Sequence, residues 1–224
     1  MALLATNSPS GQAIRAGRKT QARVKADKKV KDLVGTLAPS QEDLKAKMAL
    51  RVTADDHNID AEEELDARET DLQDALGSLS AKAHGLYESY EAPGYRRILE
   101  IAPSKVISMS EADRRAQYVK TFDALKDDTP KELAVSAKAA VSAYADYNTA
   151  YEAATTTGKA LKKALELEEA SLDHWHTAIR RLKGQLIDRY PRDNKRVAKF
   201  FSGPGAKPKK AVAAAEANDP NAPK

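Results

Sequence analysis

Residues 130–190 read PKELAVSAKAAVSAYADYNTAYEAATTTGKALKKALELEEASLDHWHTAIRRLKGQLIDRY, and this stretch decides the fold. Apolar and small side chains recur three or four positions apart, which is the period of an amphipathic helix. The members of this stripe are Leu133, Ala137, Val141, Tyr144, Tyr147, Tyr151, Leu161, Leu165, Leu172, Trp175, Ile179, Leu182, Leu186 and Tyr190. At about 1.5 Å per residue the helix is expected to be roughly 90 Å long, so it needs another long helix beside it.

The ends of this helix are marked in the sequence. Thr129 and Glu132 frame Pro130 in a capping-box pattern, so we expect the helix to start there. Tyr190 precedes a proline, which excludes further helix. Gly158 and Gly184 lie inside the helix, where they indicate a kink or a close approach of another helix.

A second long helix is predicted over residues 41–90. Leu37-Ala38-Pro39 is expected to break the chain before it, with Ser40 as the N-cap. Large apolar residues gather toward its two ends, and between these groups only Ile59 and Leu65 are large and apolar. In this middle part we expect the pairing to loosen, or small alanines to do the packing.

The remaining segments are shorter. Residues 12–36 have sparse apolar anchors and form a provisional helix, 93–109 a short helix plus loop, and 111–126 a helix with Tyr118, Val119, Phe122 and Leu125 facing inward. The sequence therefore predicts an all-α, elongated antiparallel bundle of three to four helices. Its parts are a basic, partly helical N-terminal arm (1–38), the bundle (39–190), a short helix or strand (191–202) and a disordered basic, Ala-rich tail (203–224).

Charge is distributed unevenly along the chain. Residues 1–38 hold eight Lys/Arg and two acids, and residues 189–224 hold nine and three. Of the chain's 37 basic and 33 acidic residues, 20 and 28 remain for 39–188, a net charge of −8. Two basic ends thus flank an acidic body. Cysteine is absent, which excludes disulfides and thiolate metal sites.

The basic ends supply candidate polyanion contacts. Lys and Arg side chains neutralise phosphates, so these ends indicate binding to nucleic acid or to an anionic membrane surface. The alternative is that they only keep flexible ends soluble. The candidates are Arg15, Arg18, Lys19, Arg23, Lys25, Lys28, Lys29, Lys31, Lys207, Lys209 and Lys210.

A dense acidic stretch begins after Ala54. Its candidate docking residues are Asp55, Asp56, Asp60, Glu62, Glu63, Glu64, Asp66 and Glu69. Three interpretations stay open: a solvated helix face, docking of this chain's own basic arm or a neighbour's, and an external basic partner.

No pattern typical of an enzyme occurs. Gly-rich phosphate loops, a nucleophile elbow and Glu-x-x-His ligand pairs are all missing. His174 and His176 project about 200° apart on a helix, so they cannot share one ion. The stretch from Asp56 to Asp60 begins like a calcium loop, but Ala61 stands where that loop needs glycine. We expect no catalytic, cofactor-binding or metal-binding residues.

These patterns favour a non-enzymatic structural or scaffold protein that acts by helix-face association, as coiled coils do. The stripe of 130–190 is longer than helix 41–90 can cover, so part of it should face another chain or the N-terminal helix, and we expect self-association into a homo-oligomer. The alternative is a module that binds nucleic acid or an anionic membrane through its basic segments. No stretch has the length and hydropathy of a membrane span, and we expect a cytoplasmic protein.

Overall fold

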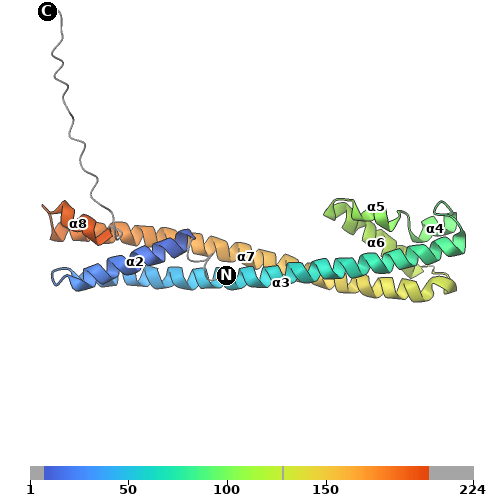
Figure 1. The fold of residues 1–224 in the computed structure, drawn as a ribbon, viewed down its shortest axis with the longest axis horizontal. Helices are drawn as coiled ribbons and strands as arrows, with labels where there is room; N and C mark the ends of the chain where they lie inside the picture. The colour runs from blue at the N-terminus through green and yellow to red at the C-terminus, as the bar shows by residue number, and fades with distance from the viewer. Residues whose placement is uncertain (1–7, 128, 202–224) are drawn as a thin grey trace, which may run out of the picture. The chain divides into compact units, whose positions relative to one another are not determined.

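The computed structural model describes residues 8–127 and 129–201, and all regular structure among them is helical. The helices are α2 (Pro9–Ala26), α3 (Val34–Tyr87), α4 (Pro93–Ile98), α5 (Pro103–Ile107), α6 (Glu111–Asp127), α7 (Ala134–Arg189) and α8 (Asn194–Phe201). Short 3-10 turns, Lys31–Leu33 and Lys131–Leu133, lead into α3 and α7. This confirms the predicted all-α class. The two very long helices, α3 and α7, pack against each other (Figure 1).

The chain divides into two compact units. Unit 1 consists of the described residues up to Met48 together with those from Glu169 onward, and unit 2 of Ala49–Glu168. Both long helices contribute to both units. α2 and α8 belong to unit 1, and α4, α5 and α6 to unit 2.

Hydrogen bonds between α3 and α7 define an antiparallel pairing in unit 1. The hydroxyl of Thr36 donates to Oε1 of Gln185 at 2.8 Å, and the hydroxyl of Ser171 donates to Oδ2 of Asp43 at 2.6 Å. Later residues of α3 therefore meet earlier residues of α7, as the sequence predicts.

The core of unit 1 includes a buried polar bridge at Gln41. Its amide donates to the carbonyl of Ile14 in α2 at 2.8 Å and accepts from the indole of Trp175 in α7 at 2.9 Å. Gln41 is 1% exposed, so both bonds satisfy groups that would otherwise lose their hydration without compensation. A Cβ at Gly17 would collide with the Gln41 side chain. Glycine there lets α2 approach closely enough for the bridge to form.

Apolar packing around this bridge covers the late part of the α7 stripe. Side chains from α2, α3, α7, α8 and the connections beside them form one cluster; its members are Ala13, Ile14, Val24, Val30, Leu33, Leu37, Leu44, Trp175, Leu182, Leu186, Tyr190, Val197 and Phe200. The N-terminal helix thus covers this apolar surface, which is one of the two coverings that the sequence predicts. Two predicted members of the stripe, Val141 and Leu165, are exposed instead.

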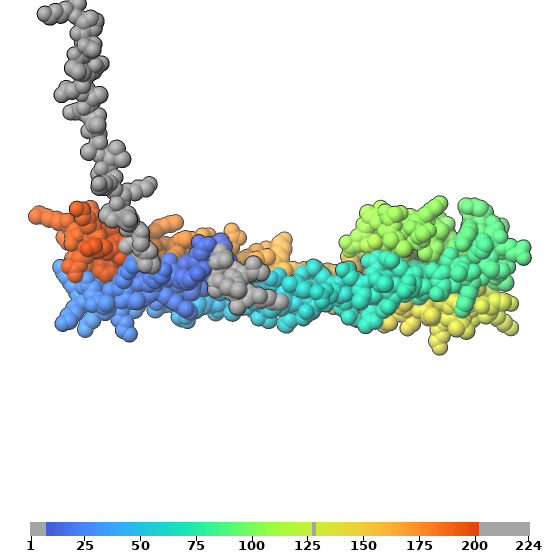
Figure 2. Space-filling view, viewed as in Figure 1, coloured from blue at the N-terminus to red at the C-terminus, as the bar shows by residue number. Residues whose placement is uncertain are grey.

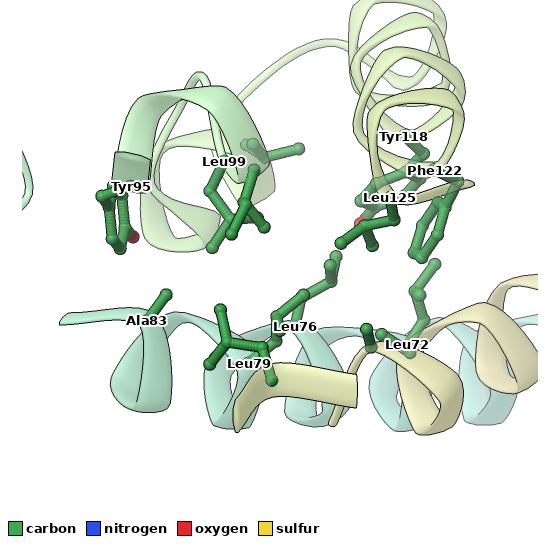
Figure 3. Close-up of a cluster of buried hydrophobic side chains, with 14 of the residues drawn as sticks. Leu72, Leu76, Leu79, Ala83, Tyr95, Leu99, Tyr118, Phe122 and Leu125 are labelled. Atoms are coloured by element: carbon green, nitrogen blue, oxygen red, sulfur yellow. The ribbon is translucent and has the colours of Figure 1, made fainter. Parts of the chain in front are cut away.

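Unit 2 has its own apolar core. Leu72, Leu76 and Leu79 of α3 face Tyr118, Phe122 and Leu125 of α6, with Leu99 beside them (Figure 3). Leu133 of the 3-10 turn before α7 also belongs to the cluster, as do Ala137, Ala140 and Tyr147 of α7. The connector contributes Tyr95, Ile98 and Val106 from α4 and α5, so it is part of the core.

Between these clusters the contacts between α3 and α7 in unit 2 are polar. Nε of Arg51 lies 2.7 Å from Oε2 of Glu168, and the Thr157 hydroxyl donates to Oδ1 of Asn58 at 3.2 Å. A Cβ at Gly158 would lie 3.4 Å from that same Asn58 oxygen, which confirms a close helix approach there. Apolar pairing does loosen in this stretch, and side-chain hydrogen bonds replace it.

The predicted break at Leu37-Ala38-Pro39 is wrong. α3 already begins at Val34 and contains Pro39, and the hydroxyl of Ser40 donates to the Leu37 carbonyl instead of capping a helix. An internal proline costs about 3 kcal/mol, and complete burial of Leu37 and Leu44 on either side of it offsets that cost. The break falls earlier, after α2, so the predicted helix over 12–36 is two elements.

Other local predictions also need correction. Thr129 does not cap α7, because its hydroxyl donates to the Leu125 carbonyl at 2.7 Å and Pro130 precedes the 3-10 turn. Val119 is exposed, since it lies about 100° around α6 from Tyr118. No neighbour lies within 4 Å of a Cβ at Gly184, so that glycine marks no close approach.

The docking of α2 is testable with two glycines of unit 1. We expect Gly17→Ala to lower the free energy of unfolding by about 2 kcal/mol, because the added methyl group displaces Gln41. Gly184→Ala should instead raise it by about 0.5–1 kcal/mol, since this helical position has space for the methyl group. Urea unfolding followed by circular dichroism measures both. Equal effects of the two substitutions would contradict the close approach at Gly17.

Candidate polyanion-binding surface

α2 separates its residues into a buried face and a basic face. The buried residues are Ser10, Gly11, Ala13, Ile14, Gly17, Thr20 and Val24. Of the basic residues of the same helix, Arg15, Lys19 and Arg23 lie opposite this face, and Arg18 and Lys25 lie at its edge; all except the half-buried Arg23 are exposed. The core therefore fixes which way the charges point.

α8 joins this basic face from the other end of the chain. Nη1 of Arg23 donates to the carbonyls of Lys199 at 2.8 Å and Phe200 at 3.4 Å. Val197 and Phe200 of α8 are buried in unit 1, which leaves Lys195, Arg196 and Lys199 exposed. Figure 2 shows α8 in red directly against α2 in blue.

Asp27 organises the turn at the end of α2. Its carboxylate accepts from Nη2 of Arg196 at 2.8 Å, from the Tyr190 hydroxyl at 2.9 Å and from the Lys29 backbone at 3.0 Å. The hydrogen bond from Arg196, followed by those from Lys29 and Tyr190, holds the pKa of Asp27 below its usual value of 3.8. The Arg196 guanidinium also lies over the Tyr190 ring, 4.5 Å from its centroid.

Two open depressions lie along the contact of α2 and α8. One is lined by Arg23, Asp27, Lys28, Lys29, Arg196 and Lys199, and the other by Arg15, Lys19 and Arg23 beside Phe201. From Pro9 to Lys31 and from Asn194 to Phe201 the chain carries eleven Lys/Arg and one acid, Asp27. We call this set the α2–α8 basic surface. Its net formal charge is +10.

The structure thus gathers all eight predicted basic residues of the N-terminal segment in unit 1. Lys207, Lys209 and Lys210 lie outside the described residues. Sequence analysis missed Lys195, Arg196 and Lys199, because they join the surface only through contacts about 170 residues away along the chain. A signal was present: apolar Val197, Phe200 and Phe201 alternate with these cations at helical spacing.

The predicted acidic face lies in unit 2, where some of its charges are paired and others are not. Glu69 lies 2.8 Å from Nε of Arg114 and is mostly buried, next to Tyr147. Burial, with a smaller contribution from Glu69, raises the pKa of Tyr147 to about 12.

Further acidic residues of this stretch have partners on their own helix. Glu64 pairs with Arg68, Asp55 lies 3.7 Å from Arg51, and Glu62 accepts from Asn58. Among the described residues, Asp56, Asp60, Glu63 and Asp66 form no ion pair. The basic N-terminal helix packs instead on Gln41 and Trp175 of unit 1.

A membrane-spanning helix and a metal cluster are both absent from the described ranges, 8–127 and 129–201. No helix there is both long enough and apolar enough to cross a membrane. No group of three or more His, Asp or Glu side chains there is placed to hold a metal ion. Trp175, between the two histidines, is buried as predicted.

Comparison of this chain with protein-family models, with curated proteins and with solved structures finds no match.

Asp27→Asn tests the electrostatic role of the turn. We expect the free energy of unfolding to fall by about 2 kcal/mol at pH 7, because charge-assisted hydrogen bonds from Arg196 and Tyr190 weaken. The folded-state pKa of Asp27 lies below its unfolded value, so its contribution is complete above about pH 4 and is lost as pH falls through the folded-state value. The difference in the free energy of unfolding between Asp27→Asn and the wild type should therefore shrink as pH falls below about 4.

Urea titrations at several pH values measure this difference. Asp32→Asn is the matched control, because the ion pair of Asp32 with Arg189 is about half exposed. This substitution should change the free energy of unfolding by less than about 0.5 kcal/mol. A difference in unfolding free energy between Asp27→Asn and the wild type that does not depend on pH would contradict the electrostatic role of Asp27.

Proposed function

We propose that this chain is a non-enzymatic binding protein whose α2–α8 basic surface contacts the phosphate backbone of nucleic acid. The observation that carries the proposal is the joining of two basic segments, distant in sequence, on one side of unit 1. The eleven cations of these two segments outnumber Asp27 and the adjacent Asp32 and Asp193, which gives a surface suited to counterion release from a polyanion.

The spacing of charges supports backbone contact. Arg15, Lys19 and Arg23 follow one another at four-residue intervals, which corresponds to about 6 Å per step along α2. α2 contains no aromatic residue, and α8 adds only the half-buried Phe201 beside Arg15 and Lys19, so the surface has no row of aromatic rings on which successive bases could stack. Contacts to phosphates position a protein on a duplex without reading sequence, so we propose binding that does not depend on sequence.

Nucleic acid is favoured over a membrane surface by the apolar residues of the same helices. An amphipathic helix binds a bilayer by burying its apolar face among the lipids. Here Ile14 and Val24 of α2, and Val197 and Phe200 of α8, are already buried in the protein core. Most of the basic side chains are exposed, whereas most of the apolar anchor is not.

The triple variant Arg18→Ala/Lys19→Ala/Lys25→Ala tests the proposal. All three side chains are exposed, so the fold should persist. We expect fluorescence anisotropy with a 20-base-pair duplex to show binding that weakens about a thousandfold between 50 and 200 mM salt. The triple variant should bind at least tenfold more weakly, and its slope against log salt should fall by about 2.7, which is about 0.9 for each phosphate that is no longer neutralised.

The matched control is Lys159→Ala/Lys162→Ala/Lys163→Ala, which removes three exposed cations of unit 2. Equal weakening in both triple variants would mean that net charge alone attracts the duplex, and the proposed surface would be wrong. Binding to phosphatidylserine vesicles but not to the duplex would also overturn the proposal.

A second proposal is structural association with another protein chain, in the first place a second copy. It is supported by an open, mostly apolar groove between α7 and α8, lined by Ile179, Ile187, Val197, Ala198 and Phe201 with Lys183 and Asn194 at its edges. Because α2 covers the late part of the stripe, an uncovered stripe no longer argues for self-association, and this groove is its main support.

Ile187→Glu tests this second proposal. If the groove joins two copies, light scattering of the wild type should give a mass that rises with concentration, and the substitution should return it to the monomer mass. Val135→Glu, at an exposed valine of unit 2, is the control that adds the same charge elsewhere. A wild-type mass equal to that of the monomer at every concentration would refute self-association.

A further inference from the structure

A small polar pocket lies between α4 and α6 in unit 2, and it shares no residue with the α2–α8 basic surface. Its volume is about 200 Å³, and its polar lining consists of Arg96, Arg97, Glu100, Gln117, Lys120 and Thr121. That volume exceeds what one water molecule needs and is sufficient for a tetrahedral oxyanion with some hydration.

Gln117 supplies the observation that points to a ligand. The residue is only 5% exposed, and its Nε2 is buried without a hydrogen-bond partner among the described residues. Leaving a buried amide donor unsatisfied costs about 1–3 kcal/mol in general, so such donors are rare in folded proteins. Nε2 is closed to solvent, so a shift of the Gln117 side chain brings this donor to an acceptor bound in the pocket, and that contact would remove the cost.

The charge of the lining indicates which acceptor fits. Arg96, Arg97 and Lys120 are cationic and Glu100 is anionic, which gives the lining a net formal charge of +2. Arg96 also forms an ion pair with Glu91 outside the pocket, and both of these side chains are more than half exposed. A doubly charged oxyanion matches this lining better than a singly charged carboxylate does.

The helices hold these groups in position. Gln117, Lys120 and Thr121 are spaced i, i+3 and i+4 on α6, so they share one face of that helix. Ile98, which ends α4 and also lines the pocket, is buried in the unit 2 core. The walls of the pocket are therefore fixed by the same packing that stabilises the unit.

We propose that this pocket binds a phosphate-type oxyanion, with the Gln117 amide and the Lys120 ammonium as direct donors. The site is independent of nucleic-acid binding by unit 1. Its ligand is either free phosphate or the phosphoryl group of a larger molecule.

Calorimetry of the full chain with inorganic phosphate at constant ionic strength tests the site. We expect the Gln117→Leu variant to bind phosphate at least tenfold more weakly, although the substitution leaves the net charge unchanged. Lys120→Ala should weaken binding by a similar factor. Lys82→Ala removes an exposed cation elsewhere in unit 2 and should alter the affinity less than twofold.

Phosphate can also bind to the α2–α8 basic surface, so the variants are needed to distinguish binding there from binding in the pocket between α4 and α6. Equal phosphate affinity in the wild type, Gln117→Leu and Lys120→Ala would overturn the proposal that this pocket binds phosphate. The absence of phosphate binding to the wild type would overturn it as well. If Gln117→Leu fails to fold, Lys120→Ala against Lys82→Ala decides alone.

Two further ligands identify the chemistry of the site. Acetate binding as tightly as phosphate would overturn the assignment of a doubly charged oxyanion. O-phosphoserine serves as the second probe: binding that Gln117→Leu weakens would support a phosphoryl group on a larger molecule. Binding of inorganic phosphate alone would support the free ion.

Discussion

The structure depends on the antiparallel pairing of α3 and α7, because a helix of more than fifty residues is stabilised mainly by the apolar face that it buries against a partner. On α3 the large apolar residues that pack in clusters stop at Met48 and resume at Leu65. The pairing therefore generates two separate cores. α2 and α8 complete the first, and α4, α5 and α6 complete the second.

The polar contacts between the two clusters have a different role from the cores. The Asn58–Thr157 hydrogen bond and the Arg51–Glu168 ion pair add little net stability relative to apolar packing, but they have partners only in one register. A slip of α3 along α7 would leave these groups buried without partners. The middle of the helix pair thus specifies alignment, while its ends supply most of the burial.

Sequence periodicity predicts the two long helices and the helix of residues 111–126 because each follows a local pattern of apolar residues. It fails at Pro39, where long-range burial of Leu37 and Leu44 overrides a local rule against proline. It also misses the assembly of the α2–α8 basic surface. The eight cations of the N-terminal segment are evident in the sequence, but those of α8 reach them only through Arg23 and Asp27, which are long-range contacts. The unpaired amide of Gln117 is likewise invisible without the structure.

The central claim, that α2 and α8 together form a polyanion-binding surface, is tested most directly by hydrogen–deuterium exchange of the full chain with and without a 20-base-pair duplex. Residue-level exchange locates the contact without altering the protein. The account predicts slower exchange of the amides of α2 and α8 when the duplex is present, and unchanged exchange in α4, α5 and α6. Protection confined to unit 2, or a duplex that changes no amide, would contradict it.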